Sequence, residues 1–199
     1  TEEYISLEKY DLVVIGSGPA GQRGAIQAAK LGHRVLLIEN FTRIGGACLH
    51  TGTIPSKTLR EAVMYLSGWR QRGFYGRSYR VKERITAEDL MQRLEITVRH
   101  EIEVLQHKLH RNFVNTLFGH GVFETPHRIR VENDDEDPQL VEAEHILIAT
   151  GSRPAWPRNV AFDAVNVVDS DHILQMQTLP RNLVVVGGGA HGHVGCGGG

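Results

Sequence analysis

The sequence has few cysteines, no long apolar run and almost no charge imbalance, and each shortage excludes a class of protein. The 199 residues include two cysteines, Cys48 and Cys196. Two are too few for a disulfide framework, and they fit a reducing compartment such as the cytoplasm. No apolar run approaches the roughly 20 residues that a membrane-spanning helix needs. A net charge of −1 gives no reason to expect binding to nucleic acid or to an anionic membrane.

The composition otherwise is that of an ordinary globular protein. Hydrophobic residues make up 41% and charged residues 23% of the chain, which is long enough to bury one real core. The first ten residues, TEEYISLEKY, contain no basic segment followed by an apolar stretch. We therefore expect no signal peptide and a cytoplasmic location.

A strand, a glycine-rich loop, a helix and a second strand follow one another near the N-terminus. Asp11–Ile15 reads DLVVI, an apolar run that is typical of a buried parallel strand. The loop Gly16–Gly21 reads GSGPAG and leads into a helix of small residues that ends at Gly32. Arg34–Glu39 (RVLLIE) then forms the second strand. This order predicts a βαβ unit of the length that a dinucleotide site requires.

The loop matches the pattern G-x-G-x-x-G, which binds a pyrophosphate through its backbone. Gly16 permits the tight turn, Gly18 lets the backbone approach the pyrophosphate, and Gly21 lets the helix pack closely on the strand. Pro19 and Ala20 complete the loop at the helix N-terminus. Free N–H groups and the positive end of the helix dipole favour phosphates there.

Glu39 lies at the end of the second strand, where a carboxylate can accept hydrogen bonds from both ribose hydroxyls. Asn40 follows it and is assigned to the same cofactor site. An acidic residue without a basic cluster beside it argues against a 2′-phosphate at this site. These residues alone do not distinguish FAD from NAD, and a glycine-rich turn with an exposed glutamate is the structural alternative.

The middle of the chain predicts two helices. One is expected over roughly Lys57–Gln71. A longer one opens at Thr86, which pairs with Asp89 in a start that resembles a capping box. Its apolar residues recur at three- and four-residue spacing, which indicates a stripe that packs in the core. They are Leu90, Leu94, Val98, Ile102, Leu105 and Leu109.

The second half of the chain predicts strands and one long connector. Gly121–Glu124 and Arg128–Val131 are expected to form a β-meander, and the acidic turn Asn133–Pro138 is its expected hairpin tip. Two buried strands are expected after it, separated by a connector over Val160–Pro180. They are His145–Ala149 (HILIA) and Leu183–Val186 (LVVV).

Residues 45–57 read GGACLHTGTIPSK and form the most specific motif of the chain. This motif resembles the segment around the redox disulfide of the flavin disulfide reductases. Thr53 stands where the second redox cysteine is expected, and its hydroxyl cannot replace a sulfur. With Thr53 and His50, the motif is similar to that of the soluble pyridine nucleotide transhydrogenase branch of the family. The matching residues are Gly45, Gly46, Cys48, Gly52, Ile54, Pro55, Ser56 and Lys57.

The resemblance implies hydride transfer from NADPH through FAD to NAD+, with NADP(H) and NAD(H) as substrates and a homo-oligomeric full-length protein. It assigns the G-x-G-x-x-G loop to the adenosine half of FAD. It also implies that Lys57 lies near the flavin and stabilises charge on the reduced ring. Further residues are implied to face or contact the flavin: Gly46, Ala47, Cys48, Gly52 and Thr53.

Three of these residues also have simpler interpretations. Cys48 without its partner is either inert packing or a modifiable thiol. Lys57 is alternatively a solvent-facing helix residue. His50 is either a proton donor near the flavin or a structural, hydrogen-bonded residue.

Two further segments resemble the family. Ala149, Thr150 and Gly151 begin an ATG-S-x-P segment that is expected to contact the flavin through its backbone. The family's second dinucleotide loop, for NAD(P)H, has the same glycine spacing as Gly187, Gly189 and Gly192. The residues after this loop lack the helix and the glutamate that family members have there. No metal site is expected from the spacing of the histidines.

The sequence therefore predicts an α/β protein. A Rossmann-like FAD-binding domain, with a parallel sheet, a β-meander and a long helix, is expected over residues 1–180. The first strand of a truncated NAD(P)-binding domain is expected over residues 181–199. Family members are more than twice as long, so the chain is expected to be an N-terminal fragment. The alternatives are a dihydrolipoamide dehydrogenase-like or other flavin reductase, and a non-catalytic flavin-binding remnant.

Overall fold

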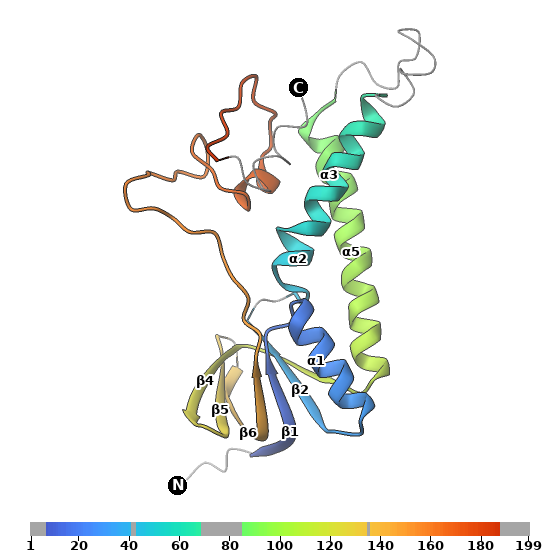
Figure 1. Cartoon of the computed structure of the whole chain (residues 1–199), viewed down its shortest axis with the longest axis vertical. Coiled ribbons are helices and arrows are strands. Elements are labelled where there is room, and N and C mark those ends of the chain that lie inside the picture. Colours follow the sequence, from blue (N-terminus) through green and yellow to red (C-terminus); the bar gives the residue numbers. More distant parts are fainter. Residues whose placement is uncertain (1–6, 41–42, 69–84, 135, 188–199) are drawn as a thin grey trace. The chain divides into compact units, whose positions relative to one another are not determined.

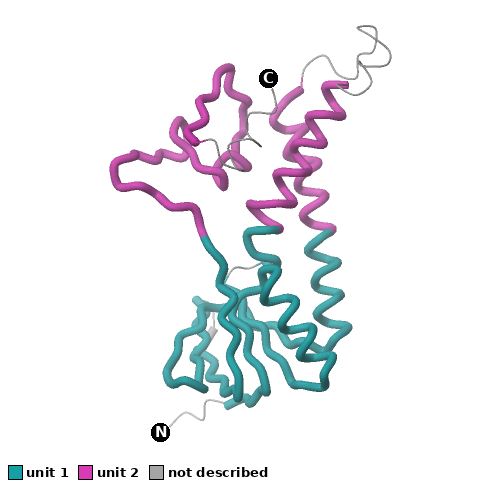
Figure 2. Tube along the Cα trace, in the orientation of Figure 1, with its two compact units in different colours: residues 1–48, 101–152 teal, residues 49–100, 153–199 magenta. Residues whose placement is uncertain are grey.

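The computed structural model describes residues 7–40, 43–68, 85–134 and 136–187. It has an α/β architecture, as the sequence predicts (Figure 1). The chain divides into two compact units, which are described one at a time (Figure 2). Unit 1 contains residues 1–48 and 101–152, and unit 2 contains residues 49–100 and 153–199.

Unit 1 is built on a six-stranded mixed sheet with the order β3-β2-β1-β6-β5-β4. The first four strands in this order are parallel, and β6, β5 and β4 form an antiparallel meander. The parallel sheet with its meander is thus confirmed. The strands are β1 (Glu8–Ile15), β2 (Val35–Glu39), β3 (Asn115–Phe118), β4 (His120–Thr125), β5 (Arg128–Asn133) and β6 (Glu136–Ile148).

Apolar side chains cover both faces of this sheet. Helix α1 (Pro19–Lys30) and the C-terminal part of α5 (Ala87–Arg111) pack on one face, around Val14, Leu37 and Leu105. The opposite face forms a second cluster, in which Val13 and Ile38 pack with Ile129 of β5. Because both faces are buried, the second half of β1 from Leu12 to Ile15 is apolar, and so is β2 up to Glu39, as is typical of parallel strands.

The N-terminal half of α5 belongs to unit 2 together with α3 (Thr53–Leu66). Helix α5 starts with a capping box, as predicted. The Thr86 backbone N–H donates to Asp89 Oδ2 at 2.9 Å, and the Asp89 N–H donates to Thr86 Oγ1 at 3.3 Å. The predicted apolar stripe is also confirmed, because Leu90, Leu94, Leu105 and Leu109 are buried, and Val98 and Ile102 are half-buried.

Several predicted boundaries are wrong. A short helix, α2 (Gly46–His50), precedes α3, which begins at Thr53 rather than near Lys57. It ends at Leu66 instead of continuing to Gln71, which lies outside the described residues. The acidic hairpin tip is shorter than expected, because β5 extends to Asn133 and β6 already begins at Glu136.

Two predictions of burial are also wrong. Ile148, at the end of β6, is 64% exposed, so the strand over residues 145–148 is only partly buried. Leu183–Val186 forms no strand, and Val184 and Val186 are 86% and 96% exposed. A strand needs a neighbour for its N–H and C=O groups, and no described strand pairs with this segment. The apolar pattern of these four residues favours a strand, but the pattern alone provides no neighbouring strand to pair with.

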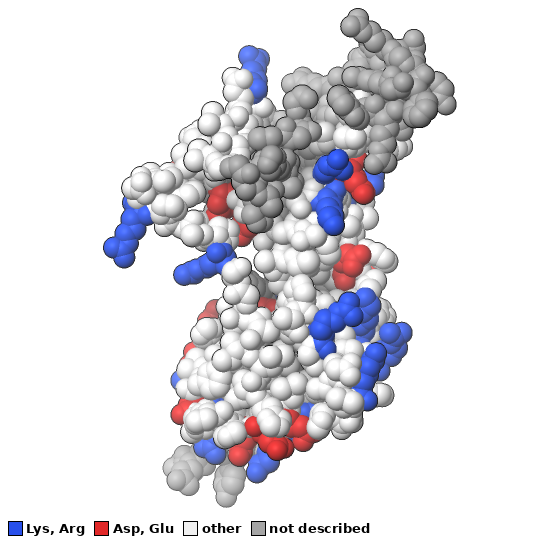
Figure 3. Space-filling model, viewed as in Figure 1, with Lys and Arg blue, Asp and Glu red and all other residues white. Residues whose placement is uncertain are grey.

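The surface carries charges of both signs on the face drawn in Figure 3. Among the described helices, none is both long and apolar enough to cross a membrane.

Candidate dinucleotide site

The loop between β1 and α1 is formed by backbone that approaches backbone closely. An added Cβ at Gly16 would lie 2.4 Å from the Ala149 carbonyl oxygen, and one at Gly21 would lie 1.8 Å from the Gly16 carbonyl oxygen. Neither position therefore tolerates a side chain. At Gly18, in contrast, an added Cβ would meet nothing within 4 Å, so this side of the loop is open.

Gly18 is also the N-cap of α1, and Pro19 is its first residue. Within the described part of the chain, no side chain caps this helix. The first turn therefore directs uncapped backbone N–H groups and the positive end of the helix dipole toward the open side of the loop. Such a helix start binds anionic groups such as phosphates.

Glu39 ends β2 and is held beside this loop by Ser17. Both residues are buried, at 5% and 0% exposure. The Ser17 backbone N–H donates to Glu39 Oε2 at 2.9 Å, and the Ser17 hydroxyl donates to the same oxygen. The Gly45 N–H in turn donates to Ser17 Oγ at 2.7 Å. The sequence indicated Glu39 but not Ser17, whose only signal was a hydroxyl between two glycines of the loop.

The start of α2 and the segment after β6 also contact the loop. Gly46 has a φ of +63°, and a Cβ there would lie 2.8 Å from Gly18 Cα. The Ala149 N–H donates to the Ile15 carbonyl at 2.8 Å, which joins the segment after β6 to the end of β1. Three chain segments that are distant in the sequence therefore meet at the carboxyl ends of β1, β2 and β6, where open parallel sheets bind ligands.

Most of the predicted cofactor residues lie in unit 1 at this edge. Asn40, Ala47 and Thr150 are exposed there, and Gly151 has a φ of +71°. The other predicted cofactor residues in unit 1 are Gly16, Gly18, Pro19, Ala20, Gly21, Glu39, Gly46, Cys48 and Ala149.

The remaining predicted residues lie in unit 2 or outside the described residues. Gly52 is the N-cap of α3, and Thr53 is its first residue. The side chains of Thr53 and Lys57 are both exposed. Gly187 has a φ of +114°. Gly189 and Gly192 are outside the described residues, as is Cys196. Cys48, half-buried in α2, is a free cysteine.

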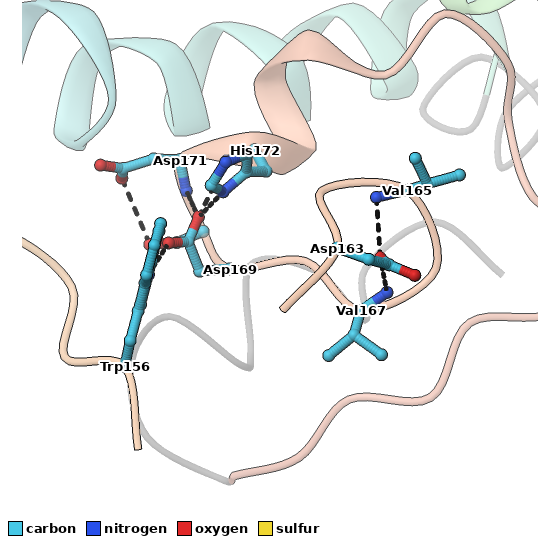
Figure 4. Close-up of polar contacts among 8 residues, drawn as sticks. Trp156, Asp163, Val165, Val167, Asp169, Asp171 and His172 are labelled. Carbon is cyan, nitrogen blue, oxygen red and sulfur yellow. Dashed lines mark hydrogen bonds and ion pairs between the residues drawn. The ribbon is translucent and has the colours of Figure 1, made fainter. Parts of the chain in front are cut away.

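Unit 2 contains a polar cluster that the sequence did not indicate (Figure 4). Asp169 accepts hydrogen bonds from the Trp156 indole at 2.7 Å and from the backbone N–H groups of Asp171 and His172 at 3.0 Å. Its Oδ1 also lies 2.7 Å from His172 Nδ1. Burial raises the pKa of Asp169, but these hydrogen bonds outweigh it and lower the pKa to about 2. Because Asp169 precedes the 3₁₀ helix His172–Gln175, the cluster fixes the start of that turn.

The chain is similar to proteins of a known family. A model of the pyridine nucleotide-disulphide oxidoreductases matches residues 10–196. The chain is 51% identical over 187 residues to a soluble pyridine nucleotide transhydrogenase of Mycobacterium tuberculosis, covering 94% of this chain and 40% of that protein. It is 33% identical over 183 residues to a protein of the same name in Colwellia psychrerythraea, covering 92% and 39%.

The fold is also similar to solved structures of a flavoprotein. The Cu(II) complex of RclA, an HOCl-induced flavoprotein disulfide reductase of Escherichia coli, superposes with a TM-score of 0.70 at 28% identity, covering 87% of this chain and 36% of that one. A cysteine-to-serine mutant of RclA gives a TM-score of 0.77, also at 28% identity, covering 94% and 39%. The chain thus spans about two fifths of the length of the proteins that it resembles.

Proposed function

The chain belongs to the pyridine nucleotide-disulphide oxidoreductase family, and on this premise we propose that it is the FAD-binding part of a soluble pyridine nucleotide transhydrogenase. The whole protein would transfer hydride from NADPH to NAD+. The observation that carries the proposal is the backbone-lined edge at β1, β2 and β6, where an uncapped helix start and a buried carboxylate lie together. The similarity to transhydrogenases supports the choice of reaction.

The residues at this edge fit the adenosine half of FAD. The open side of the loop at Gly18 leaves room for a pyrophosphate beside the first turn of α1. Glu39 lies at the end of β2, where Ser17 holds it, and its carboxylate is able to accept hydrogen bonds from the ribose hydroxyls. When bound, FAD supplies the two-electron chemistry that links one nicotinamide to the other.

The assignments near the flavin are part of the same proposal. Lys57 would lie close to the flavin and stabilise negative charge on the reduced ring. Its side chain is exposed, which leaves its ammonium group accessible to a ligand. Thr53 and Cys48 would line the same site. Gly46, Ala47, Gly52, Thr150 and Gly151 would contribute mainly backbone contacts.

The domain assignment and the wider setting are also proposed. Residues 1–180 would form the FAD-binding domain, and residues 181–199 would begin an NAD(P)-binding domain with the loop Gly187, Gly189 and Gly192. We propose a cytoplasmic homodimer or larger homo-oligomer as the full-length form. Nicotinamide dinucleotides would be its substrates.

A disulfide reductase is the second candidate, because RclA, to which the fold is similar, is a flavoprotein disulfide reductase. Thr53 counts against it. A redox disulfide needs two sulfurs within about 2.05 Å of each other, and the position that would carry the second one has a hydroxyl. Electrons would then have no thiol route out of the flavin, which favours a second nicotinamide as the acceptor.

The test is the visible absorption of the purified full-length protein, measured without oxygen. We expect an oxidised flavin band that NADPH bleaches and that NAD+ restores. The matched variant is Cys48→Ala, which should keep the full cycle, since no dithiol takes part. A protein that binds no FAD would overturn the proposal. Loss of the cycle in Cys48→Ala, together with reduction of a disulfide by the wild type, would favour the second candidate.

A further inference from the structure

We propose that Ser17 is a positioning residue for Glu39, and that its hydroxyl makes recognition of the adenosine ribose depend on the backbone at the start of α2. The inference rests on the proposed function, since it concerns the ribose end of the same cofactor site. Ser17 was not among the residues that the G-x-G-x-x-G pattern singles out, because that pattern leaves its position unspecified.

The first argument is that Ser17 holds one carboxylate oxygen twice. Its backbone N–H and its hydroxyl both donate to Glu39 Oε2, the former at 2.9 Å. Both side chains are withdrawn from water, at 0% exposure for Ser17 and 5% for Glu39. Hydrogen bonds to an ionised group are about twice as strong as neutral ones, and they are stronger still away from water. Two donors on one oxygen therefore fix the carboxylate in one orientation.

The second argument concerns the direction of the hydrogen bonds. A backbone N–H can only donate and an ionised carboxylate can only accept. The single proton of the Ser17 hydroxyl must therefore point to Glu39, so that its oxygen accepts from the Gly45 N–H at 2.7 Å. Only a side chain that both donates and accepts can stand between these two groups, and alanine can do neither.

The third argument is where Gly45 lies. It directly precedes Gly46, the first residue of α2, and Gly46 packs against Gly18 of the phosphate loop. Ser17 thus connects the predicted ribose acceptor with the backbone that leads into the helix carrying Cys48. A carboxylate offers about four acceptor positions, so the hydrogen bonds from Ser17 do not by themselves prevent Glu39 from accepting others. The geometry assigns Ser17 the task of aiming that carboxylate.

The test compares ADP with 2′-deoxy-ADP, which differ only in the 2′-hydroxyl of the ribose. Dissociation constants of both would be measured by titration calorimetry with the 199-residue chain. Losing one hydrogen bond to a charged group changes affinity by about tenfold or more, so the wild type should prefer ADP by about tenfold. Ser17→Ala should reduce this preference to less than about threefold.

Two further substitutions keep the test decisive if Ser17→Ala does not fold. Ser17→Cys nearly preserves the volume, but its thiol is a weak donor and acceptor, so the preference for ADP should fall. Ser17→Thr keeps the hydroxyl and should retain the preference. Ser67→Ala is the matched control, because it removes a hydroxyl that donates to a carbonyl at the end of α3 in unit 2.

A double-mutant cycle separates aiming from general stability. In a Glu39→Gln background, replacing Ser17 by alanine should leave the ratio of the two dissociation constants unchanged, because no carboxylate remains to be aimed. A purely structural role would lower the unfolding midpoint of Ser17→Ala but would leave that ratio at its wild-type value.

The outcomes distinguish this inference from the proposed function. If the wild type binds ADP and prefers it over 2′-deoxy-ADP while all three Ser17 variants show the same preference, the role of Ser17 is overturned and the dinucleotide site remains. If the wild type binds neither ADP nor FAD, both proposals are overturned. A preference that falls in Ser17→Ala and Ser17→Cys but survives in Ser17→Thr and Ser67→Ala supports the aiming role.

Discussion

Replacing Gly46 by alanine should cost more than replacing Gly32, although both glycines have a positive φ. The φ angles are +63° at Gly46 and +89° at Gly32. An added Cβ would lie 2.8 Å from Gly18 Cα at the first position, and would meet nothing within 4 Å at the second. The pair therefore separates the cost of backbone strain from the cost of a backbone-to-backbone contact.

The magnitudes follow from these contacts. A positive φ costs a residue with a Cβ about 1–2 kcal/mol, and the lower entropy of the unfolded alanine chain returns about 0.4–1 kcal/mol. Gly32→Ala should therefore lose about 1 kcal/mol of unfolding free energy. Gly46→Ala should lose about 1–3 kcal/mol more, because forcing extra volume into packed structure costs that much.

Urea unfolding of the two variants tests the difference. With a slope of about 2 kcal/mol per molar urea, the midpoint of Gly46→Ala should lie about 0.5–1.5 M below that of Gly32→Ala. Displacing Gly18 also shifts the phosphate loop, so Gly46→Ala should weaken ADP binding by about tenfold or more while Gly32→Ala leaves it unchanged. Equal midpoints, or an unchanged ADP affinity in Gly46→Ala, would refute the idea that α2 and the loop are in contact.

Three other predictions follow from the described contacts. Thr86→Ala removes the N-cap of α5 and should lower the unfolding free energy by about 0.5–2 kcal/mol, whereas Thr97→Ala, inside the helix, should change urea unfolding much less. Asp169 is stabilised as a carboxylate, with a pKa of about 2, so it stabilises the fold above roughly pH 4 and this contribution disappears as the pH falls toward 2. Asp169→Asn should therefore show a smaller drop in urea midpoint between those pH values than the wild type, and an equal drop would contradict the cluster. Lys57→Met should leave stability within about 0.5 kcal/mol because the side chain is exposed, yet slow flavin bleaching by NADPH at least tenfold relative to Lys30→Met, which removes an exposed lysine of α1.

Much of unit 1, and helix α5, which both units share, was predictable because the signals are local and repeated. The run DLVVI, the glycine loop and Glu39 each carry a periodicity or a backbone requirement that is visible within a few residues. The capping box at Thr86 is likewise a property of four adjacent positions. Burial of Leu90, Leu94, Leu105 and Leu109 followed from their helical spacing.

The errors arose where structure depends on distant residues. The strand β3 was missed, because NTLF has little strand pattern of its own and is ordered by pairing with Leu36–Glu39 of β2. Leu183–Val186 has an ideal strand pattern but pairs with no described strand. Ser17 could not be singled out, because its role needs Glu39 and Gly45, which lie 22 and 28 positions away.

The long strand β6 has a consequence for synthesis on the ribosome. It pairs in parallel with β1 and antiparallel with β5, so it is the only described strand that links the parallel part of the sheet to the meander. At about 5–20 residues per second, the 133 residues between the end of β1 at Ile15 and the end of β6 at Ile148 take roughly 7–27 s to translate. During that interval one edge of β1 has no partner, and unpaired strand edges are where nascent chains associate with one another. Slow translation of this stretch, or a shortage of chaperones, should therefore lower the soluble yield.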